Sequence, residues 1–424
     1  MHEGRVDPEG MKIDAQLDVD LVAVETEDEV TVMLELTAPA QRRDAPRAPA
    51  TVQVVLDRSG SMDGERLAAA RSALAALVDR LDPADRLGVV AFDDQVQVVV
   101  PAGPLMDRAA ARRAVLGIGA GGMTNLSGGL LRGLQEARRA SDRAGATVLL
   151  LSDGHANEGE TEPDRLAGVA AAAARQGATI STVGIGLGYD ERLLAAIARG
   201  GHGSHAFAAD GDGAAGAVAG EVSGLLSKTV QAASLLVRPA GTVAGVTVWN
   251  DLPSTLSGDG VMIELGDLWA GEARRLVLSF KVPAMAGLGL AEVAALELRY
   301  VTLPGFVEET VTLPLHVNVV PGDQAAGRIR DPQVTSELLF QQAQEAKRTA
   351  AEAIQRGDDG GAASAYRAAG AAIAACAPAA CTPELQAEVA ILTELADRTV
   401  AGDGAWSAKR SFAEHARKAR QRGR

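Results

Sequence analysis

Apolar runs alternate with helical stretches from residue 50 to about residue 228. The runs lie at residues 52–56, 87–92, 147–151 and 179–185, and polar residues or glycines bound each of them. Runs that are largely apolar at consecutive positions are typical of strands covered on both faces. Because these strands alternate with helices, we predict a doubly wound α/β domain around a parallel sheet.

Helical patterns fill the intervals between these runs. We expect helices at residues 66–81, 108–116, 126–140, 163–176, 191–198 and 213–226. A further apolar run at residues 96–100 follows the second strand too closely for a crossover helix. It is therefore predicted to pair antiparallel with that strand, through a turn at Asp93 and Asp94.

Apolar and polar residues alternate on both sides of this domain, in residues 11–38 and 229–320. Period-2 patterning predicts strands with one buried face. The first segment is expected to form two antiparallel strands around an acidic turn at residues 25–29. Two strands are too few to stand alone, so we expect them to join the later segment in one β-sandwich, with the α/β domain inserted.

The chain becomes helical again from Asp331, in a stretch rich in Ala, Gln and Glu. Pro378 breaks this pattern, and Thr382 followed by Pro383 restarts it as a cap with proline at the first helical position. The predicted units are a flexible leader at 1–10, sandwich strands at 11–48, the α/β domain at 50–228, the rest of the sandwich at 229–322, and a C-terminal helical module with a basic tail at 331–424.

Composition excludes two broad classes of protein. The 424 residues are 47% apolar, which is enough for a core in each unit, so global disorder is excluded. The 41 Lys and Arg against 55 Asp and Glu give a formal charge of −14, and only 3% of residues are aromatic. A nucleic-acid binder needs basic charge and stacking platforms, so we expect no nucleic-acid partner.

Nothing in the sequence predicts a membrane span or a disulfide framework. No window approaches the roughly 18 consecutive apolar residues of a spanning helix, and the first residues contain no apolar signal region. Cys376 and Cys381 are the only cysteines, and their spacing suits neither a redox motif nor a zinc site. We therefore expect a cytoplasmic protein with two idle thiols.

Oxygen-bearing side chains gather on three loops of the α/β domain. They are Asp57, Ser59 and Ser61 after the first strand, Thr124 before the third helix, and Asp153 after the third parallel strand. All three loops are expected at the carboxyl edge of the sheet, where the crevice at the reversal of strand order holds ligands.

Two carboxylates and three hydroxyls make an all-oxygen ligand set. Hard divalent cations take such a set, whereas zinc and copper prefer His or Cys, so we predict Mg²⁺, with Mn²⁺ or Ca²⁺ as alternatives. With neutral hydroxyls as ligands, an open position on the ion is expected to attract an anionic oxygen from an Asp or Glu of a partner protein.

A structural alternative is helix capping by Asp57, Ser59 and Ser61. Five such groups on three loops favour the metal site over capping. A second alternative stays open, in which the ion only stiffens the loops.

The α/β domain resembles the von Willebrand factor type A family. The Asp-x-Ser-x-Ser string, the threonine of GGMTNLSGGL and the aspartate of LLLSDG match its metal-ion-dependent adhesion site, and ISTVGIGLGYDERLL extends the match. The resemblance implies a Rossmann-like fold in which Ser59, Ser61 and Thr124 coordinate the ion directly, and Asp57 and Asp153 directly or through water. The whole chain is similar to uncharacterised bacterial relatives with this domain.

Residues beside the five ligands are expected to form the rim that contacts a partner. These rim residues are Arg58, Met62, Met123, His155 and Glu158. His155 is the candidate to hydrogen-bond a ligand carboxylate, although an ordinary exposed histidine is the alternative.

Two other patterns are expected to carry no site. The G-x-G-x-x-G string at residues 117–122 follows a helix rather than a strand, unlike a dinucleotide-binding loop. His202 and His205 lie in a Gly-rich stretch without Cys or His nearby, and we interpret them as loop histidines.

The sequence therefore predicts an adaptor that binds a partner protein through a metal ion, and not an enzyme. No general base, lysine or nucleophile elbow accompanies the metal loops. Two alternatives are a regulatory subunit of an ATPase or chelatase complex, suggested by the resemblance, and a metal-dependent hydrolase of phosphate esters.

The C-terminal end is basic although the chain as a whole is acidic. Residues 407–424 hold seven Lys and Arg and one acid, Glu414. This tail is expected either to be solvated or to dock on an acidic surface of the chain or of a partner.

Overall fold

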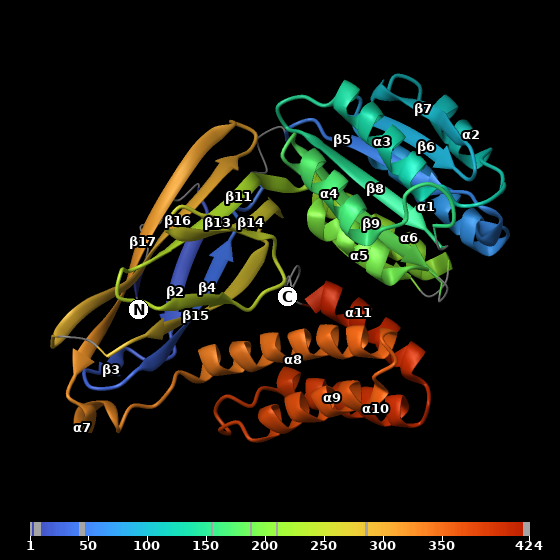
Figure 1. Cartoon of the computed structure of the whole chain (residues 1–424). Coiled ribbons are helices and arrows are strands. Elements are labelled where there is room, and N and C mark those ends of the chain that lie inside the picture. The colour runs from blue at the N-terminus through green and yellow to red at the C-terminus, as the bar shows by residue number, and fades with distance from the viewer. Residues whose placement is uncertain are drawn as a thin grey trace.

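The computed structural model describes residues 2–3, 10–41, 47–153, 156–186, 189–208, 211–284 and 287–418. These residues form an α/β domain, a pair of packed β-sheets and a group of C-terminal helices (Figure 1).

The α/β domain is built on a six-stranded sheet in the order β10-β9-β8-β5-β6-β7. The strands are β5 (Thr51–Asp57), β6 (Arg86–Phe92), β7 (Val96–Pro104), β8 (Ala146–Ser152), β9 (Ala178–Ile185) and β10 (His202–Ala208). All neighbours are parallel except β6 and β7, which confirms the predicted antiparallel pair. Strands β6 and β7 follow β5 toward one edge of the sheet, and β9 and β10 follow β8 toward the other edge. The strand order therefore reverses between the neighbours β5 and β8.

Helices cover both faces of this sheet. They are α1 (Glu65–Arg80), α2 (Arg108–Leu116), α3 (Leu126–Ala140), α4 (Pro163–Ala174), α5 (Glu191–Gly200) and α6 (Gly211–Leu226), all within a few residues of their predicted positions. One apolar cluster packs α1, α2 and α6 on one face, and a second packs α3, α4 and α5 on the other. Every residue of β5 is buried, as its apolar run requires.

Strand β10 was not predicted, and the interpretation of His202 and His205 as loop histidines is wrong. Both lie in β10, which pairs parallel with β9. His205 is 7% exposed, and its ring nitrogens contact the Thr182 hydroxyl at 2.8 Å and the Tyr189 hydroxyl at 3.2 Å. Gly203 and a register shift interrupt this edge strand, so its sequence lacks a clear apolar run.

Two further sheets pack face to face around one apolar cluster. The first has the order β1-β2-β4-β15-β12 and the second β13-β14-β11-β16-β17-β3. Their strands are β1 (His2–Glu3), β2 (Lys12–Leu17), β3 (Leu21–Ala23), β4 (Asp28–Thr37), β11 (Lys228–Pro239), β12 (Gly245–Val248), β13 (Ser254–Ser257), β14 (Gly260–Trp269), β15 (Ala273–Val282), β16 (Gly289–Thr302) and β17 (Val307–Val320). The α/β domain lies between β4 and β11 in the chain, so both flanking segments build this pair of sheets.

The N-terminal segment departs from its predicted two strands. It contributes β2 and β4 to the first sheet, but β3 crosses to the second sheet and pairs parallel with β17. The crossing keeps Val19 and Val22 in the core between the sheets. His2–Glu3, in the predicted flexible leader, pairs with β2.

The C-terminal helices are α7 (Gly322–Ala325), α8 (Pro332–Gln355), α9 (Asp359–Ala374), α10 (Pro383–Val400) and α11 (Gly404–Lys418). The predicted cap is present, because the Thr382 hydroxyl accepts a hydrogen bond from Leu385 N. An unpredicted break separates α8 from α9 at Gly357, where φ is +81°. Helices α8 to α11 pack together around apolar clusters and form the helical bundle (Figure 1). Along the described ranges, no helix is long and apolar enough to cross a membrane.

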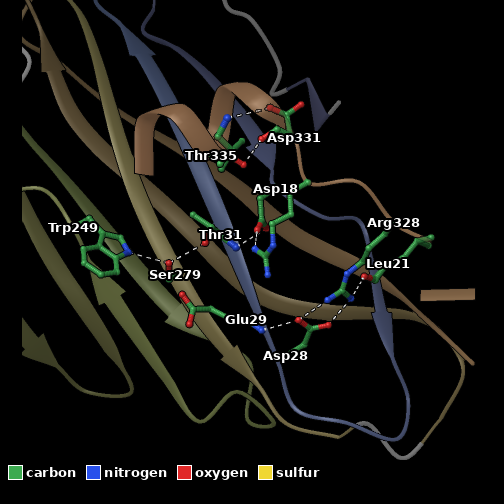
Figure 2. Close-up of polar contacts among 12 residues, drawn as sticks. Asp18, Leu21, Asp28, Glu29, Thr31, Trp249, Ser279, Arg328, Asp331 and Thr335 are labelled. Carbon is green, nitrogen blue, oxygen red and sulfur yellow. Dashed lines mark hydrogen bonds and ion pairs between the residues drawn. The ribbon is translucent and has the colours of Figure 1, made fainter. Parts of the chain in front are cut away.

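Ion pairs anchor the start of the bundle on the sheets (Figure 2). Arg328 makes a two-point ion pair with Asp28 and donates to the Leu21 carbonyl at 2.8 Å. Arg330 pairs with buried Asp18, whose carbonyl accepts from Asp331 N at 2.7 Å. Asp331 then caps α8. The chain is therefore held to the sheets up to the first turn of α8.

Candidate metal centre

Asp57 occupies the end of β5, at the reversal of strand order, with its side chain fully buried. Ser59 N donates to Oδ1 at 2.8 Å, and the Ser152 hydroxyl donates to Oδ2 at 2.5 Å. Burial raises the pKa of the Asp57 carboxyl, and the nearby charge of Asp153 adds to the shift. The carboxylate is thus oriented at both oxygens in a place where its negative charge is costly.

Hydroxyl groups connect the first loop to the third. Ser59 Oγ lies 3.1 Å from Ser61 Oγ, and Ser61 Oγ donates to Asp153 Oδ1 at 2.8 Å. Asp153 follows β8, the neighbour of β5 in the sheet. The structure therefore brings four of the five predicted ligands together. Ser61 is exposed and Ser59 is buried, so the group opens to solvent at Ser61.

The loop of Thr124 is joined to the first loop through the main chain. Gly121 N donates to the Arg58 carbonyl at 2.7 Å, and Gly60 N donates to the Gly122 carbonyl at 3.0 Å. Thr124 is buried, and its amide donates to Asn157 Oδ1 at 2.9 Å. These main-chain bonds place Thr124 beside the other four predicted ligands. Among the described contacts, the Thr124 hydroxyl makes no direct hydrogen bond to any of those four.

Glycines permit this close approach of loops. A Cβ atom on Gly121 would lie 1.8 Å from Asp93 Oδ2, and one on Gly122 would lie 2.2 Å from Asp94 Oδ1. No side chain fits at either position without moving the acidic turn after β6.

An arginine that the sequence analysis did not identify reaches the same group. Arg66, in the first turn of α1, places Nη1 2.5 Å from Asp153 Oδ2 and 3.1 Å from the Ser61 carbonyl. The Asp153 side chain is fully buried, whereas that of Arg66 is 41% exposed. One of the two carboxylates thus already has a cationic partner from within the chain.

Ser152 was also missed, because its hydroxyl reaches Asp57 only across two paired strands. A polar residue within the otherwise apolar LLLSD strand end was the available signal for Ser152. For Arg66, the signal was a cation in the turn directly after the Asp-x-Ser-x-Ser string.

The donor set fits a hard divalent cation. All predicted ligand atoms are carboxylate or hydroxyl oxygens, which suits Mg²⁺, Mn²⁺ or Ca²⁺. In the described residues, no group of three His, Cys, Asp or Glu is placed to hold a metal ion. Binding here would therefore depend on the serine and threonine hydroxyls.

The predicted rim is only partly at the surface. Met62 is fully buried in the core beneath α1, so its prediction as a rim residue is wrong. The 3-10 turn Gly60–Met62 directs this side chain inward. Arg58 is held beside the loops by an ion pair with Asp93, at 3.2 Å, and by a hydrogen bond to Gln97.

Two rim residues flank Thr124. Met123 is 50% exposed, and half-buried Glu158 donates its amide to the Thr124 carbonyl at 3.3 Å. His155 lies outside the described residues.

Comparison with known proteins assigns the α/β domain. Residues 52–218 match the model of the von Willebrand factor type A domain. A von Willebrand factor type A structure from Catenulispora acidiphila superposes with a TM-score of 0.70 at 20% identity, covering 93% of this chain and 90% of that one. The ArnB paralog VWA2 from Sulfolobus acidocaldarius gives 0.63 at 14% identity, covering 97% and 100%. These two structures share the fold.

Sequence relatives come from bacteria and animals. An uncharacterized protein from Synechocystis is 29% identical over 304 residues, covering 68% of this chain and 71% of that protein. Human inter-alpha-trypsin inhibitor heavy chain H3 is 34% identical over 131 residues, covering 28% of this chain and 15% of that protein.

Proposed function

We propose that the von Willebrand factor type A domain of this protein is the binding module of a non-catalytic adaptor, which captures an acidic side chain of a partner protein through a divalent cation. The hydrogen-bonded group of Asp57, Ser59, Ser61 and Asp153 at the reversal of strand order carries this proposal. It places oxygen ligands, and only oxygen ligands, where an α/β sheet of this kind binds.

The chain's own residues would divide the task. Ser59, Ser61 and Thr124 would supply neutral oxygens, and Asp57 and Asp153 would supply negative charge. Ser152 and the Ser59 amide hold Asp57 in one orientation. A bound ion supplies a positive charge that an external carboxylate can coordinate, and Mg²⁺ suits this ligand set best.

The position of the domain supports a role in binding other proteins. Contacts with the sheets lie at the amino ends of the strands, where Lys228 Nζ donates to the Ala144 carbonyl and Thr179 donates to Asp267. The carboxyl edge with the candidate site lies at the opposite end of the strands and is directed away from the two sheets (Figure 1). A partner could therefore reach the site without displacing the two sheets.

Calorimetric titration with Mg²⁺ and Mn²⁺ tests the proposal. The chain is expected to bind one ion per molecule, and Asp57→Ala is expected to abolish binding while the fold persists. Asp164→Ala, in the exposed first turn of α4, is the matched control and should bind as the unchanged chain does. Affinity capture of partners should then require the ion and fail with EDTA or with Asp57→Ala. Absence of ion binding at millimolar concentration would refute the proposal.

A further inference from the structure

A cleft of about 940 Å³ lies between the first sheet and the helical bundle. Side chains of β2, β4 and β15 form one wall, and the first turns of α8 and α10 form the other. Its charged lining residues, here called the cleft residues, are Asp14, Glu35, Arg275, Asp331, Glu337 and Glu384.

Carboxylates outnumber cations among the cleft residues. Arg275 lies 3.0 Å from Glu35 and 3.6 Å from Glu337, and it is the one cation among the cleft residues. Five carboxylates therefore face one guanidinium. A basic segment would be complementary in charge to this lining.

Helix α11 runs antiparallel to α8 and points toward this cleft. A Cβ atom on Gly404, at the start of α11, would lie 3.3 Å from the side chain of Ile354. Farther along, His415 Nδ1 lies 3.0 Å from the Gln344 carbonyl. Between these two contacts the residue number decreases by ten on α8 and increases by eleven on α11, so the two helices run in opposite directions. The end of α11 is directed toward the two sheets (Figure 1).

A line continued from α11 beyond Lys418 leads toward Gln341 and Glu337 of α8, and Glu337 lines the cleft. Residues 419–424 lie outside the described residues. Six residues span about 9 Å as a helix and about 20 Å when extended. Either length equals the rise of about one to four turns of α8, so these residues are long enough to reach its first turns.

The last residues of α11 and those that follow it are strongly basic. Residues 417–424 read RKARQRGR and contain five Lys and Arg and no acid. Such a segment complements the cleft residues in charge.

A buried acceptor lies on α8 one residue beyond Phe340, which lines the cleft. Gln341 is fully buried, and its Nε2 donates to Glu337 Oε1 at 3.1 Å. The described residues supply no donor to its Oε1. A carbonyl and a carboxylate side by side match the several N–H donors of an arginine.

We propose that the basic segment 417–424 docks in the acidic cleft of its own chain and so fastens the helical bundle to the first sheet. Because the segment is tethered next to the cleft, its effective concentration there reaches the millimolar range, and modest affinity suffices. The contact is electrostatic, so added salt weakens it.

Binding of a fluorescein-labelled peptide of residues 417–424 tests this proposal. The chain truncated after Lys418 is expected to bind the peptide, and the intact chain to bind it at least roughly tenfold more weakly, because the intact segment competes. Asp14→Asn with Glu384→Gln in the truncated chain should weaken binding by a similar factor. Glu308→Gln with Glu309→Gln, on β17 away from the cleft, removes the same charge and should leave binding unchanged.

Two outcomes would overturn the proposal. Equal affinity of the intact and truncated chains would mean that the cleft is open to a basic segment of another protein instead. Binding that is insensitive to Asp14→Asn with Glu384→Gln, or absent altogether, would mean that the segment does not dock there. Circular dichroism melts of each variant establish that its fold is intact.

Discussion

Asp57 and Asp153 lie in one hydrogen-bonded group, yet their surroundings differ. Among the described contacts, Asp57 receives only neutral donors, whereas Asp153 is paired with the Arg66 guanidinium. A cation from outside the chain would compete with Arg66 for Asp153 but not for Asp57. The arginine is therefore expected to set the affinity of the site.

Replacing Arg66 by Met should strengthen binding of the divalent ion. Removal of the competing charge frees Asp153, and a partly exposed ion pair is worth about 1 kcal/mol, or about fivefold in affinity. Calorimetric titration with Mg²⁺ measures the change, and Arg112→Met, which breaks an exposed ion pair with Asp79, is the control. Unchanged or weaker binding by Arg66→Met would contradict a competing role.

Gly121, in the loop that carries Thr124, gives a second prediction at the scale of single residues. Gly121→Ala should destabilise the domain by about 2 kcal/mol, since its Cβ must displace the buried Asp93 side chain, which is paired with Arg58. It should also weaken ion binding. Gly119→Ala is the matched control, because nothing lies within 4 Å of its Cβ position. Thermal unfolding and Mg²⁺ titration of both variants check the prediction, and equal behaviour would contradict it.

At the scale of elements, a single buried cation holds three helices of the bundle together. Lys347 of α8 is fully buried and pairs with Glu388 of α10 and, at 3.5 Å, with Glu414 of α11. Gln344 also donates to Glu388, at 2.7 Å. The bundle thus has a polar centre inside an otherwise Ala- and Leu-rich core.

Lys347→Met should destabilise the bundle by about 3 to 5 kcal/mol, because it leaves two carboxylates without their cation. The neighbouring Arg348→Met, which breaks partly exposed pairs with Glu345 and Glu352, should cost no more than about 1 kcal/mol. Urea unfolding of the two variants measures the difference. Similar losses in both would show that the buried pair contributes no more than a surface pair.

The sequence predicted elements best where they are long and buried on both faces. The apolar run of β5 is unambiguous because the strand is buried along its whole length, and the pattern of α3 is clear because each turn buries at least one side chain. Strands β3 and β10 were missed, since β3 has three residues and β10 is interrupted by Gly203 at a sheet edge. A pattern shows which face is buried, but not that β3 changes sheets.

The candidate site was predictable to the extent that it is local. Asp57, Ser59 and Ser61 are close in the chain, and the sheet topology brings Asp153 to them. Arg66 depends on the direction of a long side chain, which spacing does not determine.

At the scale of the whole molecule, the junction between the α/β domain and the sheets depends on a few buried charges. Lys228 Nζ lies 3.1 Å from Asp267 Oδ2, and Thr179 and the Ala232 amide also donate to this carboxylate. Burial would raise the pKa of Asp267, but the charge of Lys228 and these hydrogen bonds hold it below its ordinary value of 3.8. The ionised form is therefore the one that stabilises the junction.

Asp267→Asn should destabilise the protein by about 2 kcal/mol at neutral pH, because it leaves Lys228 partly buried without its counter-charge. A lowered pKa in the folded state means that the stabilisation is complete above about pH 3.8 and is lost as the pH falls through the folded-state value. The difference in free energy of unfolding between the unchanged chain and Asp267→Asn should thus be constant from pH 7 to about pH 4 and become smaller below pH 4. Chemical denaturation followed by circular dichroism at several pH values measures this difference. A gap that shrinks already between pH 7 and pH 5 would show that another group controls the junction, and a gap that persists in strong acid would show that Asp267 acts by packing rather than by charge.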